Sequence, residues 1–404
     1  MKKIMVIIFT FIILLSLYFI LFNNKTSKEP KEEIKKIKIG SLLGKTLEDA
    51  KKFTNNIEIE KVESNELEDT IIEQNKEEIK EDEKLKIKIA TPINYNKLKV
   101  NELGLVPIMM YHGIVNIDKT NYIGGNVDKD GYNRTSNAFR KDLEFYYNEG
   151  YKMIRLTDYV DGIIDVKQGY SPLILTFDDG HANNIKVTGL DKDGEIIIDP
   201  NSAVGILEKF KNDYNTQVTA TFFLNGGLFN QPEYNEKIIK WLIKNGYDIG
   251  NHTNTHVNFS NVDINRSIEE VGIIYEKLEK IIPNKYVNIV ALPFGSPYNL
   301  SHSNFSAILK GNYNNKEYTT KSTLRVGWES ELSPFHMNFN KTFLKRIRAY
   351  DNNGKEFDIQ MNFNILKNKR YISDGNKNII TVPDNLINTI KNDENLYVRS
   401  YPTI

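Results

Sequence analysis

The chain has 404 residues, which is enough for about two to three domains. Hydrophobic residues make up 40% and charged residues 26%, a composition that excludes a wholly disordered chain. The formal net charge is zero, so global charge does not favour a nucleic-acid partner. The lack of cysteine excludes disulfide-linked partners, thiolate ligands and a lipid-modified N-terminal cysteine, and leaves histidine and carboxylate as possible metal ligands.

Residues 1–22 begin with Lys2 and Lys3 and continue as an uncharged apolar run. A run of about 17–25 residues can cross a bilayer, and the flanking lysines orient the N-terminus toward the cytoplasm. The following "NNKTSKEPKEE" lacks the small-residue cleavage site of a signal peptide, and a buried core helix is the alternative. We expect a single-pass transmembrane signal-anchor in the cell membrane, a solvated tether at 23–35, and the rest on the cell-wall side of a bacterial membrane.

Residues 36–91 read as a small charged α+β module. "GKTLEDAKKF" predicts a helix capped by Thr46, with Leu47, Ala50 and Phe53 on one face. "IEIEKVE" and "KLKIKIA" alternate as half-buried strands. This order resembles the PASTA domain of wall-associated bacterial proteins, although "QNKE" lacks the family's Pro and Gly; a plain spacer is the alternative. Residues 92–103 are predicted to be a linker.

From Val106 onward, short apolar runs alternate with amphipathic stretches through the domain at 104–404. This rhythm indicates an α/β fold with a parallel sheet, and we expect a distorted, incomplete (β/α) barrel of about seven strands, with a flat doubly wound sheet as the alternative. Residues 264–282 predict a helix with one apolar stripe. Two insertions interrupt the rhythm: a hairpin at 185–202 and a long loop at 298–322.

Polar residues follow two of the predicted strands. Asp178 and Asp179 come directly after "LILTF", and "YDIGNHTNTH" supplies His252 and His256 at an i, i+4 spacing that one helical turn would place on one side. Functional residues sit at the carboxyl ends of parallel strands. Two histidines and a carboxylate with an open position can bind zinc or another divalent metal, which would neutralise the acid pair. A plain acidic turn and an unrelated histidine pair are the alternatives.

Five motifs occur in the order known from one enzyme family: "VPIMMYHGI", "LTFDDG", "TATFFL", "HTNTH" and "LPFG". With them, the chain resembles the polysaccharide deacetylases, also called the NodB-homology or carbohydrate esterase family 4 enzymes, over roughly residues 104–297. The first motif resembles the extracellular branch, which acts on β-linked N-acetylglucosamine polymers.

The resemblance implies a role for each matching residue. Asp179, His252 and His256 would bind one divalent metal ion, expected to be Zn²⁺ with Co²⁺, Mn²⁺ or Ni²⁺ as alternatives. Asp178 would be the general base, and Thr253 would support the site by a hydrogen bond. The third motif would form a groove wall from Pro293, Phe294 and Gly295, with the backbone N–H of Phe294 donating to the oxyanion.

The chain departs from the family at several positions. No arginine precedes "LPFG", so an arginine that orients the catalytic aspartate either comes from elsewhere, such as Arg325, or is dispensed with. The late "Leu-x-His" motif that supplies the general acid has no clear counterpart, and His336 is nearest to it by order. His112 either faces the mouth of the barrel or is a structural histidine with satisfied hydrogen bonds. His181 is expected at the rim, and Trp328 either in the acetyl pocket or in the core.

The leading hypothesis is a membrane-anchored, metal-dependent deacetylase of N-acetylglucosamine in cell-wall peptidoglycan, with release of acetate. A poly-β-1,6-N-acetylglucosamine deacetylase is the second enzymatic reading. A glycan-binding protein on a degenerate deacetylase fold is the alternative from a different class.

Overall fold

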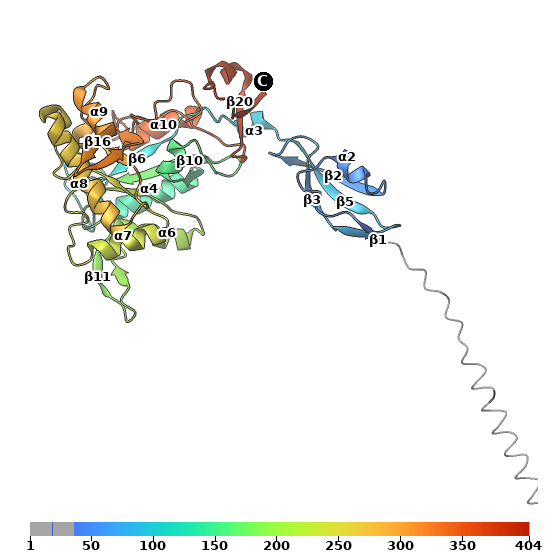
Figure 1. The fold of residues 1–404 in the computed structure, drawn as a ribbon, viewed down its shortest axis with the longest axis horizontal. Coiled ribbons are helices and arrows are strands. Elements are labelled where there is room, and N and C mark those ends of the chain that lie inside the picture. Colours follow the sequence, from blue (N-terminus) through green and yellow to red (C-terminus); the bar gives the residue numbers. More distant parts are fainter. Residues whose placement is uncertain (1–17, 19–35, 404) are drawn as a thin grey trace, which may run out of the picture. The chain divides into compact units, whose positions relative to one another are not determined.

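The computed structural model describes Tyr18 and residues 36–403. The predicted signal-anchor and tether fall outside the described residues, except for Tyr18. Within the described part of the chain, no helix combines the length and the hydropathy needed to cross a membrane. The chain divides into two compact units at Pro92 (Figure 1).

The first unit is a small α+β module. A three-stranded sheet has the order β2 (Ile57–Ser64), β5 (Leu85–Pro92), β3 (Ile71–Gln74), in which β2 runs parallel and β3 antiparallel to β5. β1 (Lys36–Lys38) pairs with β4 (Glu78–Lys80).

The helix of this unit, α2 (Leu47–Lys51), starts with a capping box between Thr46 and Asp49 and buries Ala50. It is shorter than predicted, and Phe53 is 42% exposed because the helix ends before it. The likeness of the unit to PASTA stays a prediction from the sequence.

The second unit is built on a curled parallel sheet. Its strands have the order β18 (Ser322–Leu324), β15 (Ile289–Ala291), β14 (Asp248–Asn251), β13 (Thr221–Leu224), β10 (Ser171–Phe177), β6 (Ile108–Tyr111), β19 (Ile347–Arg348). β9 (Tyr151–Met153) pairs with the start of β10 outside this order. The segment before β19 hydrogen-bonds to β18 through Thr323 and Leu344, so the sheet curls into a distorted barrel. The predicted seven-stranded barrel is confirmed, and the flat sheet is excluded.

Helices cover the outer face of the barrel (Figure 1). They are α4 (Ser136–Asn148), α6 (Ala203–Asp213), α7 (Asn235–Lys244), α8 (Ile264–Ile281) and α10 (Ile359–Lys369). Strand side chains alternate between this helix-covered core and an inner core: in β10, Leu173, Leu175 and Phe177 face outward, while Ile174 faces inward.

The insertions differ from one another. The hairpin predicted at 185–202 is confirmed as β11 (Val187–Leu190) and β12 (Ile196–Ile198). The long loop predicted at 298–322 is wrong, since this segment forms α9 (Ser303–Leu309) and a hairpin of β16 (Lys310–Tyr313) and β17 (Lys316–Thr319). The reason is turn chemistry: Asn314 and Asn315 both adopt positive φ, as a type I′ hairpin turn requires.

The predicted linker at 92–103 is also corrected, because most of it packs within the second unit. It contains the helix α3 (Tyr95–Leu98), and Ile93, Tyr95 and Val100 are buried against Tyr401 of the C-terminal strand. That strand, β21 (Tyr397–Tyr401), pairs with β20 (Ile379–Pro383), and a 3-10 helix, η3 (Asp384–Thr389), lies between them. Short elements complete the unit: α5 (Leu156–Val160), η1 (Phe259–Asn261), η2 (Pro293–Gly295) and the pair β7 (Ile114–Val115) and β8 (Arg134–Thr135).

Candidate metal centre

Asp179, His252 and His256 come together at the carboxyl ends of β10 and β14. Among the described residues, their ligand atoms lie within 4.8 Å of one another. Oδ1 of Asp179 is 3.1 Å from Nε2 of His252 and 3.3 Å from Nε2 of His256. The parallel pairing of β10, β13 and β14 brings the two strand ends to the same edge of the sheet.

The tautomer of His252 suits a cation. Its Nδ1 lies 2.8 Å from the carbonyl oxygen of Ala291, which can only accept, so Nδ1 carries the proton and Nε2 presents a lone pair. Nε2 and Oδ1 of Asp179 are buried and have no hydrogen-bond partner among the described residues. Two buried acceptors that face each other are costly unless a cation lies between them, so these residues fit a divalent metal ion.

The histidines meet through a loop rather than a helical turn, which corrects the expectation from their spacing. Residues 252–258 contain no helix, and the two imidazole rings lie 4.9 Å apart. Asp179, Thr253 and His256 all have positive φ. Such a conformation is rare for residues other than glycine and is unfavourable for β-branched threonine, and strained residues of this kind gather at functional sites.

Asp178 faces the same site but has a different partner. Arg346 donates to both of its oxygens, Nη1 to Oδ1 at 2.8 Å and Nη2 to Oδ2 at 2.7 Å. Burial favours the neutral acid, but the Arg346 guanidinium and the imidazoles of His252 and His112 outweigh it and lower the pKa of Asp178. Asp178 is therefore an ionised carboxylate that is held in one orientation.

The neighbouring groups also differ in their pKa values. Burial would raise the pKa of Asp179, but its close approach to the imidazoles of His181 and His252 holds that pKa well below its usual range. The pKa of His252 is raised, because its interactions with Asp178 and Asp179 exceed the effect of burial. The pKa of His256 is lowered, mainly by burial. The aspartates thus concentrate negative charge where a cation would bind.

Other predicted site residues lie around the candidate metal centre. Nε2 of His181 is 3.3 Å from Oδ2 of Asp179. The ring of Phe294, which is 51% exposed, lies 4.8 Å from that of His256. Pro293 and Gly295 are buried on either side of it, and a side chain on Gly295 would come within 2.9 Å of the backbone nitrogen of Val326. The "LPFG" turn therefore forms a wall beside the histidines.

Two expected side-chain contacts are not seen among the described residues. The arginine bound to Asp178 is Arg346, not Arg325, whose guanidinium lies over the rings of Trp328 and Phe343. The Oγ1 of Thr253 is buried and forms no hydrogen bond within the described residues, whereas its backbone N–H donates to Oδ1 of Asn251 at 2.8 Å.

His336 belongs to the C-terminal region, where it pairs with Ile390 and accepts from the N–H of Asn338. His112 instead directly follows β6 and interacts electrostatically with both aspartates. Trp328 is 44% exposed, which excludes the core position considered for it.

Arg346 and two asparagines are functional residues that the sequence analysis missed. Asn184 donates to the carbonyl oxygen of His112, and Asn183 accepts from the N–H of Ile114, so the "HANN" segment fixes the loop after β6. A signal for Arg346 was present in "LKRIRAY", where two arginines alternate with apolar residues as on a short strand.

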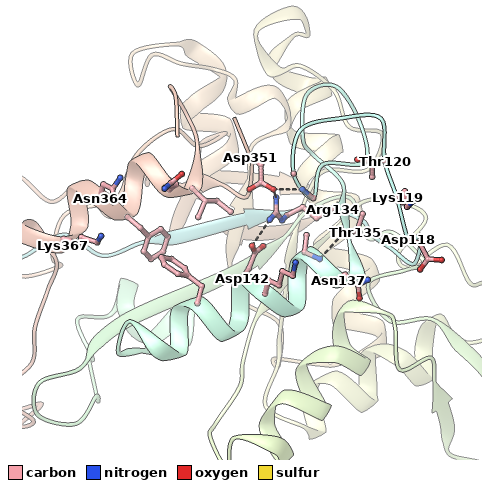
Figure 2. Close-up of a pocket in the computed structure, with 18 residues that line it drawn as sticks. Asp118, Lys119, Thr120, Arg134, Thr135, Asn137, Asp142, Asp351, Asn364 and Lys367 are labelled. Carbon is pink, nitrogen blue, oxygen red and sulfur yellow. Dashed lines mark hydrogen bonds and ion pairs between the residues drawn. The ribbon is translucent and has the colours of Figure 1, made fainter. Parts of the chain in front are cut away.

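A separate cavity of about 870 Å³ lies between α4 and α10 (Figure 2). Figure 2 shows Arg134 between Asp142 and Asp351, at 2.8 Å and 3.2 Å. Asp351 also accepts from the N–H of Gly125. Arg134, Asp142 and Asp351 are thus paired with one another, and Asp351 anchors the loop that precedes α4.

Residues 165–308 match the family model described as polysaccharide deacetylase. No curated protein sequence matches the chain. Among solved structures, the chain is similar to the deacetylase PplD of Streptococcus pyogenes in complex with acetate, with 16% identity, 66% of this chain and 99% of that chain covered, and a TM-score of 0.45.

Two further structures have lower scores. A de-N-acetylase from Aggregatibacter actinomycetemcomitans has 11% identity, covers 60% of this chain and 93% of its own, and has a TM-score of 0.39. The peptidoglycan deacetylase PdaC of Bacillus subtilis has 23% identity, covers 33% of this chain and 52% of its own, and has a TM-score of 0.23.

Proposed function

From the match of residues 165–308 to the polysaccharide deacetylase family, we propose that the protein removes acetyl groups from N-acetylglucosamine in cell-wall peptidoglycan. One observation carries the proposal: three ligand atoms converge beside an aspartate that is bound by an arginine instead of joining them. This difference in partners supports separate roles for the two carboxylates, metal binding for Asp179 and base catalysis for Asp178.

The residues that would hold the cofactor are Asp179, His252 and His256, and we propose Zn²⁺. When bound, such an ion lowers the pKa of water and polarises the acetamide carbonyl.

Asp178 acts as the base. Each of its oxygens accepts one bond from Arg346 and keeps a second lone pair, so the carboxylate can still take a proton from a water molecule aimed at the carbonyl carbon. The N–H of Phe294 donates to the oxygen on which negative charge develops.

The proton then returns to the leaving amine. Burial lowers the pKa of His112 to about 4, despite the two nearby aspartates, so this imidazole is neutral before reaction. Its buried Nδ1 has no hydrogen-bond partner among the described residues. We assign His112 the role of passing the proton from Asp178 to the amine, a role first considered for His336.

The N-terminal apolar run and its lysines support a membrane-anchored enzyme whose catalytic domain faces the cell wall. The second candidate, poly-β-1,6-N-acetylglucosamine deacetylation, is supported by the "VPIMMYHGI" motif, whose His112 interacts electrostatically with the acid pair. The same fold used only to bind glycan is the third reading.

The deciding experiment measures acetate released by the full-length chain from peptidoglycan and from poly-β-1,6-N-acetylglucosamine, after chelation and after zinc is restored. Zinc-dependent release from peptidoglycan supports the proposal. Release from the second polymer alone favours the second candidate. Tight glycan binding without acetate release from either polymer would favour the third reading, a protein that only binds glycan.

A further inference from the structure

Two arginines of one strand face the inside of the barrel. In and after β19, Ile347 and Ala349 belong to the helix-covered outer core. Successive side chains of a strand point to opposite faces, so Arg346 and Arg348 point inward together. Arg346 reaches Asp178. Arg348 follows it toward the carboxyl end of the strand, which is the end that holds the metal centre.

Arg348 is clamped by two aromatic rings. Its guanidinium carbon lies 5.1 Å from the ring centre of Tyr132 and 4.4 Å from that of Tyr350. Gly131 lies against Tyr350, since a Cβ there would come within 2.0 Å of the ring. The clamp therefore holds the guanidinium in a defined place.

No acid neutralises this guanidinium. Within the described residues, Arg348 has no ion pair, and its buried Nε has no hydrogen-bond partner. Nearby carboxylates are engaged elsewhere: Asp128 accepts from Tyr132 and Asn133, and Asp351 pairs with Arg134. Most other arginines of the unit do have a carboxylate partner, namely Arg134, Arg155, Arg266, Arg346 and Arg399.

The clamp adjoins the catalytic groups. The ring of Tyr132 makes an edge contact with that of His112 at 4.9 Å, and His112 interacts with Asp178 and Asp179. A single tyrosine ring thus separates Arg348 from the histidine that we assign to proton transfer. A glycan with one sugar at the metal centre would bring a neighbouring substituent near Arg348.

The rings contact the faces of the guanidinium and leave the N–H donors in its plane without an acceptor. A carboxylate matches that plane with two parallel hydrogen bonds. Resting on the function proposed above, we propose that Arg348 binds a carboxylate substituent of the glycan. The substrate class is therefore an N-acetylated glycan that carries carboxylates, and not a neutral polymer.

The carboxylate could come from two sources, an acid group on the sugar itself or one on an attached peptide. Glycan strands with free sugar carboxylates and no peptide represent the first. Strands in which the sugar acid is amide-linked to a peptide represent the second. A neutral N-acetylglucosamine oligomer is the reference.

The test compares kcat/KM for acetate release on each acidic strand with that on the neutral oligomer. Arg348→Gln should lower this ratio about tenfold or more, mainly through KM, because it removes a charge-assisted pair. Arg348→Lys keeps the positive charge but loses the two parallel N–H donors of the guanidinium, so its ratio should lie between that of the unmodified chain and that of Arg348→Gln. Arg140→Gln is the matched control, since Arg140 on α4 bonds amide oxygens of Asn137 and Asn201 and should leave the ratio unchanged.

A ratio that Arg348→Gln leaves unchanged on both acidic strands would overturn the proposal, as would an equal fall in Arg140→Gln. If Arg348→Gln does not fold, the test depends on the Arg348→Lys ratio and on the salt dependence of KM for the unmodified chain. The KM of the unmodified chain should rise with salt more on the acidic strand than on the neutral oligomer. Equal salt dependence would contradict the assignment.

Failure of the proposed function would look different. The unmodified chain would then release no acetate from any strand. Binding of the same strands to the unmodified chain, Arg348→Gln and Arg140→Gln, measured by calorimetry, would still show whether Arg348 selects carboxylates.

Discussion

Arg346, directly before β19, binds both oxygens of Asp178, at 2.8 Å and 2.7 Å. A two-pronged pair of this kind fixes the plane of a carboxylate as well as its charge. It also explains why Asp178 and Asp179, adjacent in the chain, can differ in role: one is bound by an arginine and the other faces two imidazoles.

Replacement of Arg346 by lysine should therefore lower kcat about 10- to 100-fold, because the base keeps a positive neighbour but loses its fixed orientation. Steady-state acetate release measures the effect, and bound zinc should stay at one equivalent. Arg325→Lys is the control and should change kcat little, since Arg325 does not contact Asp178. A comparable loss in both variants would contradict the pairing argument.

Substitutions of Asp178 and Asp179 should have different effects on zinc binding. Asp178→Asn is expected to reduce kcat about 100-fold or more and still bind zinc, because its oxygens contact Arg346 and not the ligand set. Asp179→Asn should lose zinc as well. Elemental analysis after gel filtration measures both; an Asp178→Asn protein without metal would reverse the assignment.

Zinc should also stabilise the fold. A ligand at a hundredfold excess over its Kd adds about 2.7 kcal/mol to the free energy of unfolding, so chelation should lower the melting temperature and zinc should restore it. In His252→Ala, whose Nε2 is lost, the shift should disappear. A zinc-dependent shift of the same size in that variant would show that the ion binds elsewhere.

The buried network of Figure 2 predicts a large loss of stability. Arg134→Leu leaves Asp142 and Asp351 without their partner and should cost about 3–5 kcal/mol in urea unfolding. Lys141→Leu, an exposed neighbour in the same cavity, is the control and should change stability by about 0.5 kcal/mol or less. Similar losses in the two variants would show that the network is not what stabilises the loop.

Glu102 should make stability fall with rising pH. Burial, with a contribution from Asp374, raises the pKa of Glu102 to about 8 from its ordinary 4.5, although three hydrogen bonds oppose the shift. The folded state then holds a proton that the unfolded state releases, so its contribution is full below pH 4.5 and is lost as pH rises through 8. Urea unfolding between these values should show the decline, and Glu102→Gln should flatten it; an unchanged slope would contradict the shift.

Local pattern was enough to predict most of the fold of the second unit. The apolar run "LILTF" is a fully buried strand, and the period of the stripe in 264–282 matches α8. These signals are local because period and burial are properties of neighbouring residues. The hairpin at 310–319 is not predicted, because Asn-rich sequence is typical of loops and does not by itself show that Asn314 and Asn315 adopt the positive φ of a hairpin turn.

The sequence by itself determined the residue types at the site: two aspartates after one strand and two histidines after another, at strand ends that parallel pairing brings to one edge. The tertiary structure decided their partners. Arg346 is 168 residues from Asp178, and nothing in its own segment indicates that β19 pairs beside β6. The register between distant strands follows from the packing of the whole barrel. The arginine that binds Asp178 is therefore identified as Arg346, and not Arg325, only from the tertiary structure.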